Sequence, residues 1–139
     1  RMEHDSYPGS CRLHGDCIEG LINSQAIADR CNIKRTSLHE LSDDNAVWNV
    51  IAFYLAQLCA NVTYLLSPEV IVLGGGILQR TVLLPLIHQH FTEIIHGYFD
   101  VDKINHRLDE YIVRSQYGND IGLIGAMELA RRQYDGIHH

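Results

Sequence analysis

Two short apolar strands flanking a helix are the feature that most constrains this chain. Residues 70–73 read VIVL and are closed by three glycines, and residues 111–113 read YIV. A helical pattern near residues 81–97 lies between them, so the strands are expected to pair in parallel through a helical crossover. Strands that are apolar on both faces are typical of a parallel sheet buried on both sides. Two strands this short do not form a stable sheet alone, so the remaining strands are expected from upstream sequence or from a partner chain.

Helices are predicted on either side of this unit. Residues 45–66 carry apolar side chains at steps of three and four, which predicts a long amphipathic helix. Residues 42–44, Ser-Asp-Asp, are expected to cap its start, and Pro68 is expected to end it. One or two short helices are predicted within residues 17–30, and a last helix from Ile121 to about Tyr134.

Two further predictions concern the second half of the chain. The charged residues 100–110 are expected to form a loop. The helix near 81–97 is expected to turn one side inward; the candidates are Leu83, Leu86 or Ile87, His90 or Phe91, and Ile94.

Length and charge limit the class of protein. The 139 residues suit one domain or one lobe of a larger protein, and the start at Arg1 suggests a piece of a longer product. A net charge of −6 argues against binding to a nucleic-acid backbone, because no basic stripe is present. No uninterrupted apolar run reaches the roughly 18 residues that a membrane span needs, so no membrane partner is expected. The closing pair, His138 and His139, is given no function.

The segment CRLHGDC at residues 11–17 is the first candidate for chemistry. Cys11, His14 and Cys17 are separated by two residues each, and Gly15 permits the backbone to turn tightly between them. Two thiolates and an imidazole suit a structural zinc ion, which normally takes four ligands. The alternative is three unrelated side chains in a loop. The fourth ligand would be either His4 or a residue upstream of Arg1.

The cysteines also bear on the compartment. A secreted chain could pair its four cysteines in disulfides, but the Cys-x2-His-x2-Cys spacing and the lack of an apolar signal segment at the start favour reduced thiols. We therefore expect a cytoplasmic protein. Cys59 falls within the long helix and is expected to be a small core residue.

Glycine-rich turns follow both predicted strands. Gly74, Gly75 and Gly76 come directly after the first strand, and residues 117–122, YGNDIG, come after the second. The carboxyl ends of parallel strands lie at one edge of a sheet, where α/β proteins bind ligands. The two turns therefore indicate one shared pocket, although a strand-to-helix turn without a ligand has the same pattern. Glu19 follows the last candidate zinc ligand and suits either sugar hydroxyls or the dipole of a helix N-terminus.

Three segments together resemble bacterial fructokinases of the ROK sugar-kinase family. CRLHGDCIEGLINSQAI is similar to CPYHGDCLEGLASGPAI, the pattern of that family's zinc loop and following helix. LLSPEVIVLGGGILQ is similar to LSPEKIILGGGVMQ, and EYIVRSQYGNDIGLIGAMELA is similar to DYIVPPGLGDNAGILGALALA. The order and spacing of the segments agree as well, so the resemblance covers nearly the whole chain.

The resemblance implies an α/β chain with an actin-like ATPase (ribonuclease H-like) fold. Residues 1–139 would supply its C-terminal lobe with an incomplete sheet: residues 1–17 as a zinc-binding loop and residues 18–139 as the helices and two parallel strands. The zinc would be held by Cys11, His14 and Cys17 together with a histidine upstream of Arg1, which leaves His4 as the second choice.

The resemblance also implies an activity, which is ATP-dependent phosphorylation of a hexose, first of all fructose to fructose 6-phosphate, with Mg²⁺ and in a cytoplasmic homodimer. Its catalytic aspartate and phosphate loop would lie upstream of Arg1, so this chain alone is expected to be inactive. Glu19 would contact the sugar. The implied nucleotide-site residues are Gln25, Gly74, Gly75, Gly76 and Gln79.

Two alternatives stay open at this point. The first is a ROK-type sugar-responsive transcriptional regulator, but regulators of the family usually carry a CxCGxxGC zinc loop, which this chain lacks. The second is a non-catalytic lobe kept for interactions. Ser24 and Gln25 motivate it, because they replace a glycine and a proline of the family's nucleotide loop and put a Cβ where the family has none.

Overall fold

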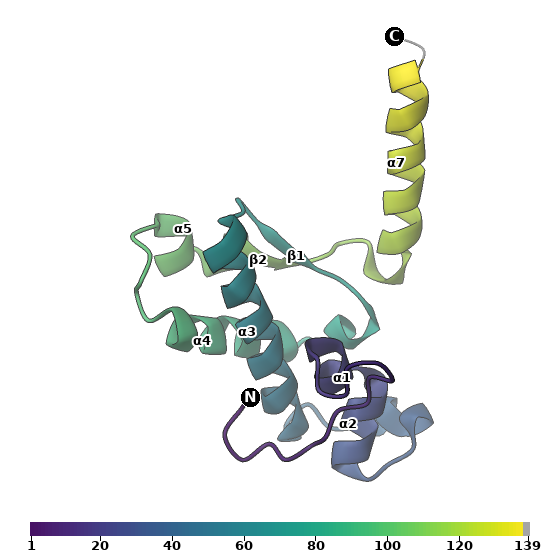
Figure 1. Cartoon of the computed structure of the whole chain (residues 1–139), viewed down its shortest axis with the longest axis vertical. Coiled ribbons are helices and arrows are strands. Elements are labelled where there is room, and N and C mark those ends of the chain that lie inside the picture. The colour runs from purple at the N-terminus through teal and green to yellow at the C-terminus, as the bar shows by residue number, and fades with distance from the viewer. Residues whose placement is uncertain (138–139) are drawn as a thin grey trace.

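The computed structural model describes residues 1–137, and helices make up most of it (Figure 1). His138 and His139, which were given no function, lie outside the described residues. Within the described part, the sheet consists of two short parallel strands. The elements in chain order are α1 (Ile18–Ile22), α2 (Ser24–Cys31), η1 (Arg35–Glu40), α3 (Val47–Leu66), β1 (Ile71–Leu73), η2 (Gly76–Gln79), α4 (Leu83–Ile95), α5 (Asp102–Asn105), α6 (Leu108–Tyr111), β2 (Ile112–Arg114), η3 (Gly118–Asp120) and α7 (Ile121–Ile137).

The predicted long helix is present as α3. Its start differs from the prediction: the residues 42–44 do not cap it, and the side chain of Asn45 instead accepts the backbone N–H of Val47 at 3.0 Å. It ends where expected, since Ser67 adopts a left-handed conformation directly before Pro68. By length and composition α3 would also qualify as a membrane span, but half of its 20 residues are buried in the protein. Core packing therefore accounts for its apolar character.

Helices α3 and α4 pack against each other and form the centre of the core (Figure 1). The residues of α4 that face α3 recur at every fourth position: Leu83, Ile87, Phe91 and Ile95 are all buried. Ile94, which the sequence placed on this side, is partly buried and packs against the core, while Ile95 completes the fully buried row.

Strands β1 and β2 pair in parallel, as expected, with Ile71 opposite Ile112 and Leu73 opposite Arg114. Helix α4 forms part of the crossover between them. One face of the pair packs toward the helices, and Ile112 is fully buried there. The other face is open, since Val72 is 52% exposed. The expectation that both faces of the strands are buried is thus not met within the described residues.

Residues 100–110 were expected to form a loop, and this expectation is wrong. They fold into the single turns α5 and α6, and Tyr111, expected in a strand, ends α6. Asp102 stabilises these turns, because its carboxylate accepts a hydrogen bond from Arg107 at 2.7 Å and lies 3.2 Å from the ring of His106. Charged side chains that lie one helical turn apart can pair and stabilise a helix. A high content of charged residues therefore does not by itself indicate a loop.

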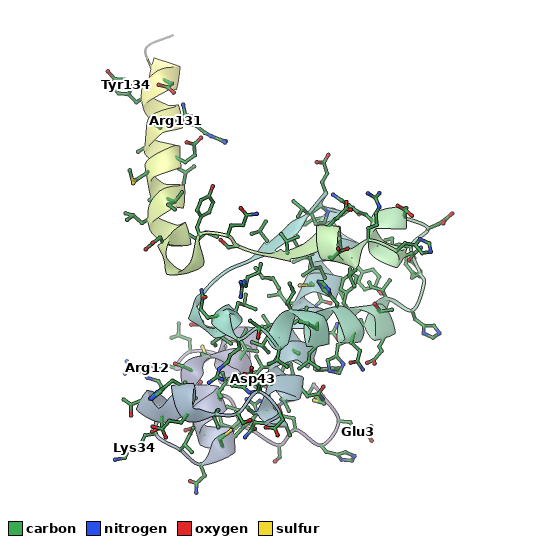
Figure 2. All side chains as sticks on the ribbon, turned by 180° about the vertical axis from the view of Figure 1, so that it is seen from behind. Glu3, Arg12, Lys34, Asp43, Arg131 and Tyr134 are labelled. Atoms are coloured by element: carbon green, nitrogen blue, oxygen red, sulfur yellow. The ribbon has the colours of Figure 1, made fainter. Side chains whose placement is uncertain are left out.

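Helix α7 extends away from the rest of the molecule (Figure 1). One side of it carries charged pairs, with Arg131 bound to both Glu128 and Asp135 (Figure 2 labels Arg131). Another side carries large apolar residues that are about two-thirds exposed, among them Leu123 and Met127. An amphipathic helix normally buries such a side against a partner.

Candidate functional site

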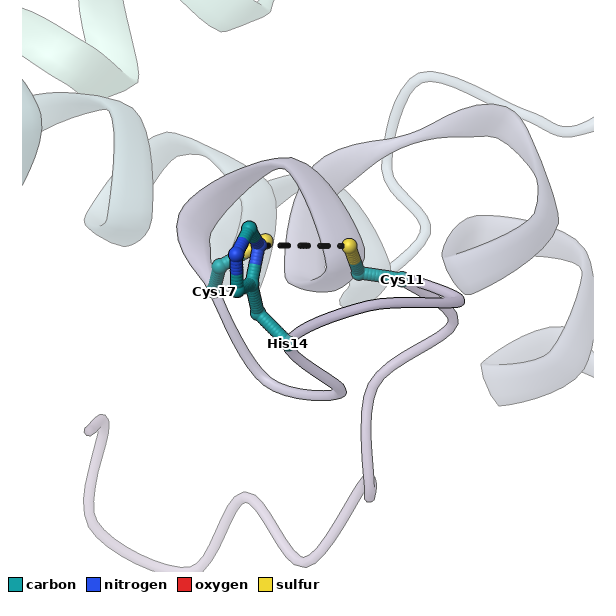
Figure 3. A group of neighbouring side chains, drawn as sticks. All are labelled: Cys11, His14 and Cys17. Carbon is teal, nitrogen blue, oxygen red and sulfur yellow. Dashed lines mark hydrogen bonds between the residues drawn. The ribbon is translucent and has the colours of Figure 1, made fainter.

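The CRLHGDC segment folds into a tight turn that brings its three candidate ligands together. Backbone hydrogen bonds join Cys11 and Gly15 in both directions, at 3.1 and 3.0 Å. The thiols of Cys11 and Cys17 and the ring of His14 thereby face one another, with one ligand atom of each within 4.8 Å of the others (Figure 3). The sequence spacing, which suggested a common ion, corresponds to this geometry.

The backbone of the turn at Gly15 packs closely against α1 and against the segment before Cys11, and two glycines make this close packing possible. A Cβ on Gly20, in α1, would lie 2.2 Å from the carbonyl oxygen of Gly15. A Cβ on Gly9 would lie 2.1 Å from the same oxygen. Real Cβ atoms do not come this near to a carbonyl oxygen, so the metal loop, residues 9–17, is held in place by backbone packing on both sides.

The chemistry of this cluster fits a zinc ion. Zn–S bonds of about 2.3 Å and Zn–N bonds of about 2.0 Å put neighbouring ligands of a tetrahedron roughly 3.5–3.8 Å apart. The separation of Cys11 Sγ and His14 Nδ1 is 3.8 Å. Hydrogen bonds from the backbone N–H groups of His14 and Leu13, with a smaller contribution from the Cys17 side chain, lower the pKa of Cys11 to about 7. This favours the thiolate, which is the form that binds metal.

His4 does not complete this cluster. Its side chain is exposed and lies 3.6 Å from the carboxylate of Glu3, and it is not among the grouped ligands of the described residues. Three ligands alone do not close a structural zinc site. Among the described residues, no fourth candidate ligand joins this cluster.

A buried ion pair anchors the segment that leads into the metal loop. The guanidinium of Arg30, in α2, donates to Asp5 at 2.7 Å and to the carbonyl of Leu21 at 2.7 Å. The hydroxyl of Tyr54, in α3, donates to the same aspartate at 2.6 Å. Burial alone would raise the pKa of Asp5, but the hydrogen bonds from Arg30, Tyr54 and the N–H of Tyr7 outweigh it and lower the pKa to about 2. The N-terminal segment is thus fixed to two helices.

Glu19 lies in the first turn of α1, two residues after Cys17. Its side chain is exposed and makes no hydrogen bond or ion pair with any residue in the described range. The carboxylate is therefore available to a ligand, and the metal loop fixes the start of the helix that carries it.

The two glycine turns that follow the strands lie next to each other, but they do not line the one shared pocket that the sequence predicted: Gly76 and Gln79 line one cavity, and Tyr117 and Ile121 line another. A Cβ on Gly74 would lie 3.3 Å from the side chain of Ile121, which comes from the second turn. A Cβ on Gly118 would lie 3.5 Å from the side-chain nitrogen of Gln79, which comes from the first. Gln79 and the glycines after β1 and β2 thus share one edge of the sheet.

A cavity of about 630 Å³ connects this edge to the start of α2. Of the residues predicted for the nucleotide site it includes Gly76 and Gln79, and it includes Ser24, the residue that departs from the family pattern. Gln25 is not among the lining residues, because it points outward from α2 and bonds to Asp29 at 2.7 Å. The lining residues are Asn23, Ser24, Ile27, Leu38, His39, Trp48, Gly76, Ile77, Gln79 and Arg80.

The sequence reasoning missed one wall of this cavity. The Arg80 guanidinium lies 5.0 Å from the ring centre of Trp48 and donates to the carbonyl of Leu38 at 2.7 Å. It also pairs with Asp43 at 3.0 Å. These residues are far apart along the chain and carry no common motif. The only available signal was the position of Arg80 directly after the glycine turn.

Comparison with known proteins assigns the chain to a family. The sequence profile of the ROK family matches residues 1–133. The chain belongs to the ROK family. Membership implies an actin-like ATPase fold, and the cluster of Cys11, His14 and Cys17 is consistent with the zinc motif of ROK proteins.

Three relatives are similar over most of this ROK chain. A putative fructokinase of Bacillus subtilis is 36% identical over 132 residues, which cover 95% of this chain and 43% of that protein. A fructokinase of Pediococcus pentosaceus is 33% identical over 94% of this chain and 43% of that protein. A fructokinase of Zymomonas mobilis is 34% identical over 89% of this chain and 40% of that protein. The chain therefore spans well under half of the length of these relatives.

Proposed function

We propose that the full-length protein is an ATP-dependent hexose kinase whose substrate is fructose. The observation that carries this proposal is the similarity to proteins named fructokinase, at 33–36% identity over at least 94% of the chain for two of them. The structure adds support, because the metal loop leads directly into α1, which carries the exposed Glu19, and α2 follows with Ser24 in the lining of the cavity beside the first glycine turn. No observation favours the transcriptional regulator.

Most of the predicted residues have a role in this proposal, and Gln25, which points away from the cavity, has none. Cys11, His14 and Cys17 hold a structural zinc with a fourth ligand from elsewhere in the protein. The free carboxylate of Glu19 accepts hydrogen bonds from the sugar hydroxyls. Gly76 and Gln79 line the nucleotide cavity, whereas Gly74 and Gly75 lie in the preceding turn and are not part of its lining.

Catalysis needs groups that this chain does not contain. A sugar hydroxyl is a poor nucleophile, and a general base that takes its proton typically contributes about 10²–10⁴ in rate. The expected base is an aspartate upstream of Arg1, and bound Mg²⁺ would offset the charge on the transferred phosphate. This chain contributes binding and positioning, so by itself it should show no detectable kinase activity.

The open face of the sheet is where we place the rest of the polypeptide. A cavity of about 600 Å³ lies between the strands and α7, and it is lined mainly by apolar residues such as Val72, Val113, Ile121 and Ile124. In this arrangement residues 1–139 are the C-terminal lobe, the missing strands extend the sheet, and α7 contacts the preceding part of the protein. We further propose a homodimer in the cytoplasm, which light scattering and cell fractionation would test.

The test is an assay of ADP formation by the full-length protein with fructose, glucose, mannose or no sugar. We expect fructose-dependent ADP formation and fructose 6-phosphate as the product. Zinc-loaded protein that binds nucleotide but phosphorylates none of these sugars would instead support the non-catalytic lobe. Protein that binds no nucleotide would overturn the kinase proposal altogether.

A substitution sharpens the assignment of Glu19. Charged hydrogen bonds contribute about 1.5–3 kcal/mol, so Glu19→Gln should raise the KM for fructose about 10- to 100-fold and leave the KM for ATP within about twofold. Glu69→Gln is the matched control, because Glu69 is also exposed but lies outside the metal loop and the cavity. An unchanged fructose KM in the Glu19 variant would remove this residue from the sugar site.

A further inference from the structure

The metal loop and the nucleotide cavity meet at two side chains. Ser10 directly precedes the ligand Cys11, and Asn23 lines the cavity at the start of α2. The hydroxyl of Ser10 donates to the side-chain oxygen of Asn23 at 2.9 Å. We propose that Ser10 is a positioning residue that couples metal binding to nucleotide binding through Asn23. The inference rests on the proposed function, because it takes the cavity to be the nucleotide site.

Asn23 is the point at which three segments join. Its side-chain oxygen accepts the N–H of Ala26 at 2.9 Å and so caps α2. Its backbone N–H donates to the carbonyl of Glu19 at 3.1 Å, which closes α1. Asn23 therefore affects the end of α1 through its backbone, and the start of α2 and the wall of the cavity through its side chain.

Ser10 is itself held in place by α1 and by its neighbours in the metal loop. Its backbone N–H donates to the carbonyl of Gly20 at 2.9 Å, and its hydroxyl lies 3.1 Å from the same oxygen. Gly9 on one side packs against the backbone of Gly15, and Cys11 on the other is a metal ligand. A metal ion that fixes Cys11 thus also fixes the position from which the Ser10 hydroxyl reaches Asn23.

The backbone hydrogen bond of Ser10 does not depend on its side chain. Replacing Ser10 by alanine should therefore leave the metal loop folded and able to bind zinc. The Ser10 hydroxyl has one proton and two acceptors within reach, the Asn23 oxygen at 2.9 Å and the Gly20 carbonyl at 3.1 Å, so the variant loses one neutral hydrogen bond. Such bonds contribute about 0.5–1.5 kcal/mol. A loss of this size corresponds to an increase in the nucleotide Kd of about three- to tenfold.

The experiment measures binding of the ATP analogue AMP-PNP to the full-length protein by calorimetry, before and after zinc is removed with a zinc-selective chelator. For the unmodified protein we expect removal of zinc to raise the Kd about three- to tenfold. In Ser10→Ala the Kd should already be raised by that factor with zinc bound, and chelation should change it by less than about twofold. If zinc and Ser10 act on nucleotide binding through the same contact, their effects on the Kd are not additive.

Two variants serve as controls. Ser10→Thr retains the hydroxyl and should behave like the unmodified protein. Ser6→Ala changes an exposed serine on the same N-terminal segment that makes no bond to α2, and it should have no effect. A merely structural effect of the alanine substitution would lower zinc content or stability and would not be rescued by threonine.

A second measurement tests the coupling without nucleotide. Hydrogen exchange in residues 23–31, which form the start and body of α2, should become faster when zinc is removed from the unmodified protein. Unchanged exchange there, a normal response to chelation in Ser10→Ala, or loss of zinc from that variant would each overturn the inference. Failure of the unmodified protein to bind AMP-PNP would instead overturn the proposed function, and the exchange measurement would still decide the coupling.

Discussion

Three of the four cysteines show how strongly the pKa of a thiol depends on its surroundings. Burial raises the pKa of Cys59 to about 11, and burial also raises the pKa of Cys31. Backbone N–H groups lower the pKa of Cys11 to about 7. Only a thiolate binds metal well, so Cys11 is suited to be a metal ligand, whereas Cys31 and Cys59 are suited to the core.

This difference predicts which cysteine substitutions affect metal content. Cys17→Ser should remove most of the zinc from the full-length protein, which we expect to carry about one ion per chain. Cys31→Ser is the matched control, because this half-buried thiol lies outside the cluster and should leave the metal in place. Elemental analysis of both variants measures the effect. Equal zinc content in the two would disprove the metal loop.

Gly20 provides a second prediction at the level of one residue. Alanine is normally better than glycine in a helix by up to about 1 kcal/mol. Here its Cβ would lie 2.2 Å from the carbonyl oxygen of Gly15, so Gly20→Ala should destabilise the protein by about 1–3 kcal/mol. Gly136→Ala, in a part of α7 where a Cβ meets nothing within 4 Å, is the control and should not destabilise. Urea denaturation compares the two.

At the level of elements, the metal loop depends on how the N-terminal segment is attached to α2 and α3. Arg30 and Tyr54 converge on Asp5, and the side chains of Arg30 and Asp5 are only 10% and 8% exposed. A charge removed from water must be paired, so this pair also fixes the direction in which the segment approaches the helices. The first residues are thereby ordered without belonging to any helix or strand.

The pair predicts how stability depends on pH. The pKa of Asp5 is about 2 in the folded protein, below the ordinary value of 3.8 that the unfolded chain would have. The stabilisation is therefore complete above about pH 4 and is lost as the pH falls toward 2, and it amounts to about 2 kcal/mol. Asp5→Asn should lose this contribution and show a smaller change in the free energy of unfolding across that interval. Asp109→Asn, at an exposed position on α6, should retain the full pH dependence.

At the level of the whole molecule, the core is complete around α3 and α4 but open at the sheet and α7. Leu123 and Met127 lie one helical turn apart on α7, and both are about two-thirds exposed. Relatives of this chain are more than twice as long. A contiguous apolar surface of this kind is typical of an interface, and we assign it to the remainder of the same polypeptide.

This assignment predicts that substitutions on two faces of α7 differ in their effect on the free energy of unfolding. In the full-length protein Met127→Asp should lower the free energy of unfolding by about 1–3 kcal/mol, because a charge would enter a buried contact. Arg132→Gln, on the charged side of the helix, should change it by less than about 0.5 kcal/mol. Thermal or chemical denaturation distinguishes them, and equal, small effects would mean that this face of α7 remains in solvent.

The sequence by itself determined the features that depend on neighbouring residues. The periodicity of residues 45–66 predicted α3, the apolar runs predicted β1 and β2, and two-residue spacings predicted that Cys11, His14 and Cys17 share a turn. Each depends on contacts within a few residues, where backbone geometry and residue type are sufficient. The helical turns at 100–110 were missed because charged residues form local pairs there that the apolar pattern does not reveal.

Only the tertiary structure decided which distant segments meet. It brought Asp5 to Arg30, joined Ser10 to Asn23, and built one cavity from the start of α2, Trp48 and Arg80. It also turned Gln25 away from that cavity. These contacts depend on how α3, α4 and the strands pack as a whole. No local pattern records such packing, because the free energy of each long-range contact depends on all the others that form with it.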